Sequence, residues 1–281
     1  MATFYNQATL SYNGIVTDSN VTEGEIVGAL EVAKTAISTS YRRGDTIAYA
    51  VSILNSSEST TGGVTLADSL GSYEVGGVTY RPLDYLDGSV RLFIGGTLVA
   101  PPTVSTEGVL TFSGISIPAN TSAILIYQAT VNDTAPLAVG SQITNTVTVS
   151  GSCEDVIASA TVPVREETSL TIAKAISPEA VSCGEEISYT FIIQNTGNTA
   201  ADETAGVSVR DVFTPILNGI SVRLNGQPFP ATSYTYDTAT GAFVTTAGEI
   251  TVPAATYTQD PLSGAVTLTP GVAVLTVTGT V

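Results

Sequence analysis

The chain has 281 residues, enough for two ordinary domains, and with 43% hydrophobic and 12% charged residues it can bury a core. It contains no histidine and no tryptophan, so the usual acid-base catalyst and the commonest metal ligand are absent. The 25 acidic and 9 basic side chains give a formal charge of −16, which disfavours nucleic acid and anionic membranes as partners. We therefore expect no enzyme of a common class, no cofactor and no metal.

The composition also bears on location. The N-terminus lacks the basic and apolar regions of a secretory signal, and no apolar run reaches the length of a membrane span. Abundant Thr, Val, Ser and Ala are typical of exported β-proteins. We expect an extracellular protein of a cell or spore surface, without membrane insertion, whose signal has been removed or whose export uses none.

The local pattern predicts β-strands almost throughout. Apolar residues alternate with small or polar ones in Ile47–Ile53, Ile143–Val149, Ile187–Ile193 and Val272–Thr278. Gly, Asn, Asp and Pro turns separate these segments, and no stretch has a sustained helical period. Short strands at regular spacing predict antiparallel sandwiches of immunoglobulin-like type.

The sequence repeats itself at a constant offset of 140 residues. Leu30–Lys34 corresponds to Leu170–Lys174, and the correspondence continues without a gap to Asn55 and Asn195. Further along, Ala123–Val131 corresponds to Ala273–Val281 at an offset of 150. The chain therefore contains two copies of one domain.

The two copies differ in completeness. After Val131 the first copy continues into a hairpin of Ile143–Val149 and Val156–Val162, whereas the second copy stops at Val281. The missing hairpin corresponds to the start of the chain, where Phe4–Leu10 aligns with Ile143–Val149 at an offset of 139. We expect a donor hairpin and linker at 1–28, a complete domain at 29–164, a linker at 165–168, and a domain at 169–281 without its last two strands.

A sandwich that lacks two strands exposes unpaired backbone groups and an open core. The predicted fold is therefore all-β, with two tandem immunoglobulin-like β-sandwich domains, the second completed by the N-terminal hairpin of a neighbouring subunit. Its donor strand carries Phe4, Asn6, Ala8 and Leu10. Such a contact repeats indefinitely and gives a head-to-tail homopolymer. The alternatives are completion by the chain's own hairpin, and a tandem-repeat surface protein with arbitrary boundaries.

The only two lysines, Lys34 and Lys174, occupy the same position in each copy. Strand alternation places each lysine on the apolar, inward face, where an unpaired ammonium is unfavourable. The same alternation turns Asp68 and Asp211 inward, and also Asn145. In the second domain the corresponding asparagine, Asn6, would come from the neighbouring chain.

These motifs resemble the bacterial surface repeat known as domain of unknown function 11. The similarity rests on the lysine strand, a Gly-turn-Tyr segment, the turn Asn195–Gly197, Asp68–Leu70 and Asn145–Val149. The Lys, Asp and Asn set is also similar to that of Gram-positive pilin domains, which form Lys to Asn isopeptide bonds. The resemblance implies a bond of Lys34 to Asn145 assisted by Asp68.

By the same resemblance, Lys174 would bond to Asn6 of the next subunit with Asp211 assisting. The alternative is a buried Lys–Asp ion pair with the asparagine as a hydrogen-bonding neighbour. Asn55 and Asn195 share the inward face and are rival acceptors, although they lie beside turns.

Cys153 and Cys183 lie in turns at far ends of successive domains. An intrachain bridge is not expected, so the alternatives are an intersubunit disulfide and two free thiols.

The leading function is a structural subunit of an extracellular, pilus-like filament. The alternative is an adhesive or ligand-binding module on a tandem surface stalk, with a self-completed second domain and contact loops at Ser72–Asp87 and Thr232–Thr258.

Overall fold

The computed structural model describes residues 2–26 and 30–281. Its regular structure is β apart from two short 3-10 helices, so the predicted all-β fold class is confirmed. The chain divides into two compact units. Unit 1 comprises Met1–Ala135 and Gln142–Pro163, and unit 2 comprises Pro136–Ser141 and Val164–Val281. The four opening strands belong to unit 1 in this division, and within the described residues they pair only among themselves.

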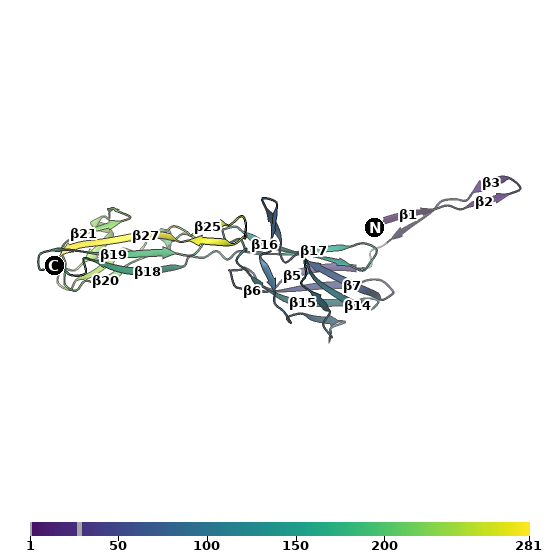
Figure 1. Cartoon of the computed structure of the whole chain (residues 1–281), viewed down its shortest axis with the longest axis horizontal. Helices are drawn as coiled ribbons and strands as arrows, with labels where there is room; N and C mark the ends of the chain where they lie inside the picture. The colour runs from purple at the N-terminus through teal and green to yellow at the C-terminus, as the bar shows by residue number, and fades with distance from the viewer. Residues whose placement is uncertain (1, 27–29) are drawn as a thin grey trace. The chain divides into compact units, whose positions relative to one another are not determined.

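The opening strands form one long hairpin (Figure 1). Strand β1 (Ala2–Asn6) pairs with β4 (Thr22–Ile26), and β2 (Thr9–Tyr12) pairs with β3 (Ile15–Asp18). The tip is an Asn13-Gly14 turn with φ of 46° and 79°, a conformation that this residue pair adopts readily. Every side chain from residue 3 to 23 is exposed, so this N-terminal hairpin has no core of its own.

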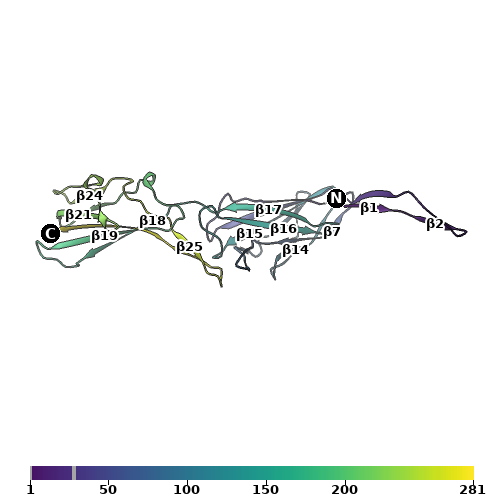
Figure 2. The same cartoon turned by 90° about the horizontal axis from the view of Figure 1, so that it is seen from above.

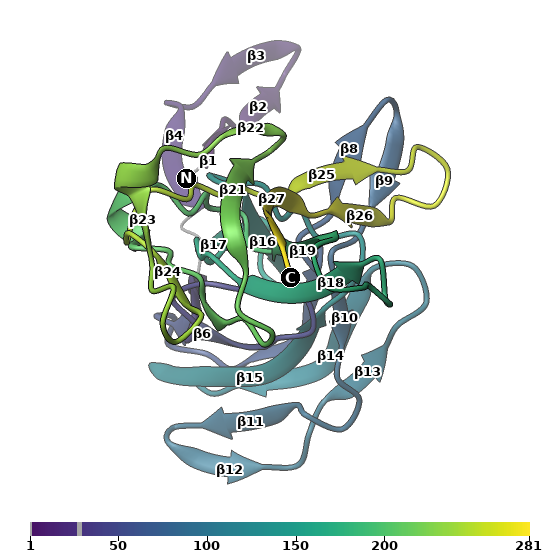
Figure 3. The same ribbon diagram turned by 90° about the vertical axis from the view of Figure 1, so that its left-hand side faces the viewer.

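The rest of unit 1 is a sandwich of two sheets (Figures 1 and 2). The first sheet has the order β12 (Thr97–Val99), β11 (Arg91–Ile94), β15 (Thr121–Val131), β6 (Thr46–Asn55) and β5 (Leu30–Ala36), and β10 (Leu83–Tyr85) also pairs with β15. The second has the order β13 (Thr103–Ser105), β14 (Leu110–Ile117), β7 (Thr61–Asp68), β16 (Gln142–Ser150) and β17 (Val156–Pro163). Figure 3 shows β11 and β12 extending the first sheet beyond β15, and β8 (Tyr73–Val75) and β9 (Val78–Tyr80) forming a separate hairpin.

Unit 1 is closed along one side by its last hairpin. Strand β16 pairs with β7, and β17 packs beside β5. As a result β5 has an inward face, and its Leu30 is only 4% exposed. The core between the sheets is aromatic, with Tyr49 stacked on Tyr127 and Phe112 tilted against it.

Unit 2 has the same layers with fewer strands. One sheet has the order β18 (Leu170–Ser177), β19 (Glu186–Asn195), β27 (Gly271–Thr280), β21 (Asn218–Leu224) and β22 (Gln227–Pro228). The facing sheet has the order β20 (Arg210–Val212), β24 (Ala242–Thr245) and β23 (Tyr234–Tyr236). A single apolar cluster joins both sheets. The remaining elements are the hairpin of β25 (Thr256–Gln259) with β26 (Val266–Thr269), and the 3-10 helices η1 (Glu203–Ala205) and η2 (Ala231–Ser233).

The two units differ where the closing hairpin lies in unit 1. Among the described residues β20 pairs only with β24, whereas its counterpart β7 pairs with both β14 and β16. Every residue of β18 is exposed, and Leu170 is 38% exposed compared with 4% for Leu30 at the corresponding position. Unit 2 therefore has an open sheet edge and an uncovered strand.

This difference in burial predicts unequal effects of one substitution in the two repeats. We expect Leu30→Ala to destabilise unit 1 by about 2–5 kcal/mol, because it leaves a cavity in a closed core. Leu170→Ala should reduce the stability of unit 2 in the monomer by about 1 kcal/mol or less. Urea unfolding followed by hydrogen exchange of the β5 and β18 peptides measures both. Equal losses in the two units would contradict the open edge.

Candidate functional site

The three residues that sequence reasoning placed on the inward face of domain 1 come together in unit 1. Lys34 lies on β5, Asp68 ends β7, and Asn145 lies on β16. The Lys34 ammonium donates to Asp68 Oδ2 at 2.6 Å, and both side chains have no exposed surface. Asn145 is fully buried as well. Two of the three strands belong to one sheet and the third to the other, so the pocket exists only when the sandwich is closed.

A fourth residue, Tyr127 of β15, joins Asp68 to Asn145. Its hydroxyl donates to Asp68 Oδ2 at 2.6 Å and accepts from Asn145 Nδ2 at 2.9 Å. Sequence reasoning missed this residue, although strand alternation in Ala123–Val131 turns it inward and a buried hydroxyl needs a partner. Comparison with the second repeat does not point to Tyr127 either, because Val277 occupies the corresponding position there.

The turn after β7 supplies the remaining hydrogen bonds. Leu70 N donates to Asp68 Oδ1 at 3.0 Å, while Gly71 N and the Ser69 hydroxyl donate to Asn145 Oδ1 at 3.2 and 3.3 Å. Leu70 and Gly71 both have positive φ, 49° and 71°, which directs successive backbone N–H groups inward. The amide carbonyl of Asn145 is thus held by two donors and polarised toward attack at its carbon.

Burial changes the proton affinities in this pocket. Loss of water lowers the pKa of Lys34 to about 8, although the Asp68 carboxylate partly opposes the shift. Burial also raises the pKa of Tyr127 well above its usual value, and the nearby Asp68 charge raises it further. Lys34 therefore has an accessible neutral form, in which its amine is a nucleophile.

The rival acceptors have structural roles in turns. Asn55 donates to the carbonyls of Ser59 and Ile117, and its Oδ1 accepts from Ser57 N. Asn195 bonds in the same manner with Ser169, Gly197, Thr199 and Pro253. Both amides are satisfied where they lie, and β-sheet pairing places Asn55 opposite Leu30 instead of Lys34.

Unit 2 has the corresponding pair in an open setting. Lys174 forms an ion pair with Asp211, and the two side chains are 41% and 19% exposed. The Lys174 ammonium lies 4.6 Å from the ring centre of Tyr189 and 5.6 Å from that of Phe213. Because Val277 replaces the tyrosine of unit 1, no hydroxyl lies at the corresponding place beside Asp211.

Beside this ion pair lies an apolar groove of about 180 Å³. Its walls come from β18 and β19 on one sheet and from the segment that leads into β20 on the other. The lining residues are Leu170, Thr171, Ile172, Ile193, Val207, Ser208 and Val209. In unit 1 the corresponding space is filled by β16 and β17, so the groove marks the position of the strands that unit 2 lacks among its described residues.

The expected donor residues lie on the N-terminal hairpin with their side chains in solvent. Asn6 ends β1 and is exposed, and its backbone carbonyl accepts from the Thr22 hydroxyl. Phe4 is 52% and Leu10 60% exposed, and Ala8 is exposed between β1 and β2. The structure thus brings Lys174 and Asp211 together within unit 2, and Asn6 is exposed on the N-terminal hairpin.

The two cysteines are the remaining candidate site residues. Cys153 and Cys183 are both exposed and free. Within residues 2–26 and 30–281, no group of three or more His, Cys, Asp or Glu side chains has an arrangement that could hold a metal ion. No helix in the described part of the chain has the length and apolar character needed to span a membrane.

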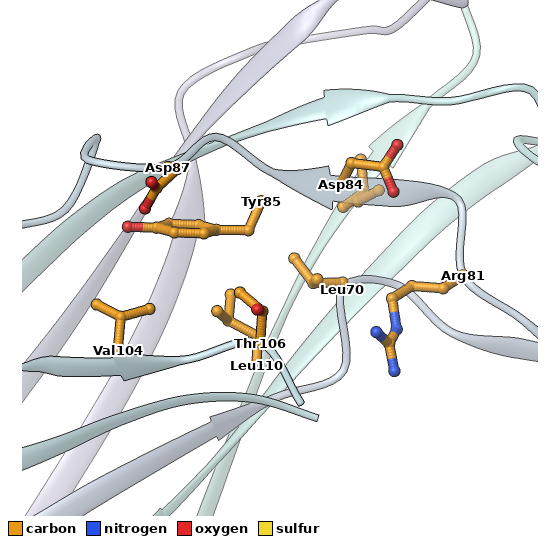
Figure 4. Close-up of a pocket in the computed structure, with 9 residues that line it drawn as sticks. Leu70, Arg81, Asp84, Tyr85, Asp87, Val104, Thr106 and Leu110 are labelled. Carbon is orange, nitrogen blue, oxygen red and sulfur yellow. The ribbon is translucent and has the colours of Figure 1, made fainter. Parts of the chain in front are cut away.

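Another hollow, of about 530 Å³, lies in unit 1 and is lined partly by the segment expected to contain contact loops, Ser72–Asp87 (Figure 4). Figure 4 shows the Tyr85 ring between the Asp87 carboxylate and Val104, with Arg81 on the far side of Leu70. The Arg81 guanidinium donates to the Gly108 carbonyl at 2.6 Å. The hollow is lined by Leu70, Arg81, Leu83, Asp84, Tyr85, Asp87, Val104, Thr106 and Leu110.

No protein-family model and no curated protein matches the sequence. Among solved structures, the full-length major pilin SpaD from Corynebacterium diphtheriae aligns over 92% of this chain and 73% of its own, with 12% identity and a TM-score of 0.38. The major pilin subunit BcpA of Bacillus cereus aligns over 96% and 73%, with 13% identity and a TM-score of 0.37. A family 123 glycoside hydrolase from Clostridium perfringens aligns over 49% and 27%, with 10% identity and a TM-score of 0.31. Likeness at these levels does not establish function, and the resemblance to domain of unknown function 11 stays a prediction.

The lysine pocket generates a direct test, because the chain has only two lysines to observe. In Asn145→Ala, where Lys34 has no Asn145 to attack, we expect one lysine to titrate with a pKa of about 8 instead of 10.5. Because the unfolded chain holds that proton up to 10.5, raising the pH from 8 to 10.5 should stabilise unit 1. Lysine-selective ¹³C NMR measures the titration, and Lys174→Arg assigns the two signals. A Lys34 pKa at or above 10.5 would contradict this account.

Proposed function

We propose that this chain is the structural subunit of an extracellular, pilus-like filament, in which the N-terminal hairpin of one copy completes unit 2 of the next. One observation carries the proposal. The groove of unit 2 corresponds to the space that β16 and β17 fill in unit 1, and the exposed N-terminal hairpin corresponds in sequence to β16 and β17 themselves. Addition of strands from another chain to an open sheet edge is an established mode of assembly.

The repeat fixes the expected register of the inserted strand. In unit 1, Val147 lies opposite Asp68 and Val149 lies opposite Leu66. The offset of 139 converts Val147 and Val149 into Ala8 and Leu10, and an offset of 143 converts Asp68 and Leu66 into Asp211 and Val209. The inserted strand would therefore place Ala8 opposite Asp211 and Leu10 opposite Val209. Alternate residues then face the core, so Phe4, Asn6, Ala8 and Leu10 all point into the groove.

Insertion would bury apolar surface on both partners. In the free chain Leu170 and Ile172 are 38% and 58% exposed, and Phe4 and Leu10 are 52% and 60% exposed. Moving such a side chain from full exposure to full burial contributes roughly 1.5–3 kcal/mol. The edge of β20 would also gain the backbone hydrogen bonds that β7 makes with β16.

The attachment points on unit 1 favour insertion into another copy over self-completion. The hairpin precedes Leu30, which pairs with Asn55 at one end of β5. Unit 2 follows Pro163, whose carbonyl accepts from Tyr41 N beyond the other end of β5. The hairpin and unit 2 are thus attached to opposite ends of a seven-residue strand, roughly 23 Å apart. Insertion into a neighbour repeats one junction and produces an open chain of subunits.

We further propose that two isopeptide bonds reinforce the filament. The neutral amine of Lys34 attacks Cγ of Asn145, a new amide forms, and Nδ2 leaves as ammonia. Asp68 accepts a proton from the attacking amine and returns one to the leaving nitrogen, with the Tyr127 hydroxyl between carboxylate and amide as the relay. Lys174 would react in the same manner with Asn6 of the inserted hairpin, with Asp211 directly beside both groups.

The filament itself can be tested by electron microscopy of the purified protein. We expect the full chain to form filaments with a two-unit axial repeat, and deletion of residues 1–28 to abolish them while unit 1 stays folded. Leu10→Asp should also abolish them, because it places a charge in the groove. Leu98→Asp is the matched control, since Leu98 is 57% exposed on β12, outside the hairpin. Filaments formed by the deleted chain would overturn the proposal.

The covalent bonds can be tested separately, by mass spectrometry and by heating filaments in reducing detergent. We expect the full chain to lose two ammonia molecules per subunit and to run as a ladder. Asn6→Ala should still form filaments, which dissociate to monomers with one ammonia lost. Asn145→Ala should keep the ladder and also lose only one. Filaments that yield monomers of unreacted mass would show that each Lys–Asp pair is only an ion pair.

A further inference from the structure

Each cysteine lies in a turn at a definite end of its unit. Cys183 lies between β18 and β19, and the next residue, Gly184, donates from its backbone N–H to the Val281 carbonyl at 2.7 Å. Cys153 lies between β16 and β17, where Gly151 packs against Val64. Both thiols are exposed and unpaired.

The repeat has no cysteine at either corresponding position. The offset of 140 converts Cys183 into Arg43 of unit 1, and the offset of 139 converts Cys153 into Gly14 at the tip of the N-terminal hairpin. A filament of this chain has two kinds of junction, one within a subunit and one between subunits. Arg43 of unit 1 and the tip of the hairpin inserted into unit 2 would lie at the junction within a subunit. The two cysteines would therefore occur only at the junction between subunits.

The donor hairpin connects the two cysteine-bearing turns. In unit 1, Tyr41 N donates to the Pro163 carbonyl at 3.0 Å. At the offset of 140, Tyr41 corresponds to Val181 and Pro163 corresponds to Glu23. We therefore expect Val181 N to donate to the Glu23 carbonyl of the inserted hairpin. The base of the hairpin therefore leaves unit 2 two residues from Cys183.

From that point the chain enters unit 1 of the next copy close to its cysteine turn. Leu30 is seven positions after Glu23 in the sequence, so the chain between them can reach at most roughly 25 Å. Strand β17 packs beside β5, and its last residue, Pro163, accepts from Tyr41 N just beyond the end of β5. The two strands therefore run in the same direction, and the start of β17 at Val156 lies at the same end as Leu30. Cys153 is three residues before Val156, so both cysteine turns border one junction.

We propose that Cys183 of one subunit and Cys153 of the next form a disulfide across every intersubunit junction. The inference rests on the proposed insertion of the hairpin. Two thiols are oxidised to one disulfide by exchange with an external small-molecule disulfide. That disulfide is reduced to two thiols, and each protein cysteine gives up its proton to solvent. The bond joins unit 2 of one subunit directly to unit 1 of the next, independently of the hairpin.

The test uses filaments of Asn6→Ala, in which no isopeptide bond can join subunits. Filaments grown with glutathione disulfide and heated in detergent should run as a ladder without reductant and as monomers with it. Adding Cys153→Ser or Cys183→Ser should abolish the ladder, while electron microscopy still shows filaments. Peptide mapping of filaments made from equal amounts of ¹⁴N and ¹⁵N protein should find Cys153–Cys183 pairs of mixed isotope composition.

The outcomes separate this inference from the filament proposal. Filaments whose thiols stay free under the disulfide oxidant, or that contain only Cys153–Cys153 or Cys183–Cys183 pairs, would overturn the disulfide and leave strand insertion intact. Cys153–Cys183 pairs that are all of uniform isotope composition, with no mixed pairs, would mean an intrachain bridge and would also overturn it. Absence of filaments in every variant, and in the unaltered chain, would overturn strand insertion and with it the junction on which the disulfide depends.

Discussion

The pairing of β16 with β7 is the interaction on which the structure of unit 1 depends. It adds β16 and β17 to the second sheet and brings β17 alongside β5, so that the core between the two sheets is closed along that side. Lys34 and Asp68 are buried beside this hairpin, and its own strand β16 supplies the buried Asn145. In unit 2 the corresponding strands, β18 and β20, have no such cover, and Leu170 and Lys174 are in contact with solvent. One hairpin thus determines both the packing and the chemistry of its unit.

The two lysine pockets illustrate how burial and hydrogen bonding act together. In unit 1 the carboxylate of Asp68 accepts from an ammonium, a phenol and a backbone N–H, so a costly buried charge is fully solvated by the protein. In unit 2 aromatic rings surround Lys174 on one side and water reaches it on the other. An incoming strand would remove that water and would make the second pocket resemble the first.

Much of the fold could be predicted from the sequence, because strand alternation and a constant repeat offset are local and cumulative signals. Alternation also identified the faces of Lys34, Asp68 and Asn145, and the structure brings these residues together. It could not identify Tyr127 as their link, because that contact depends on which residues meet across two packed sheets. The pairing within the N-terminal hairpin could not be predicted either. One extra residue between β3 and β4 shifts the pairing, where Ala8 N bonds to the Ser19 side chain. Such a bulge follows from side-chain hydrogen bonds that alternation does not encode.

The internal pairing of the N-terminal hairpin bears on how the proposed filament would grow. A donor made of one strand arrives as an unfolded peptide, and its ordering entropy is lost during association. Here β1 with β4 and β2 with β3 are already paired, and a tight Asn-Gly turn joins them. Insertion would then start from an ordered hairpin and not from a flexible tail. The pairing within the hairpin would have to shift, because Phe4 lies opposite Gly24, whereas the closing hairpin of unit 1 predicts Phe4 opposite Thr22. The rate of subunit addition would depend on collision and alignment, and the net negative charge of the chain would make that rate sensitive to ionic strength.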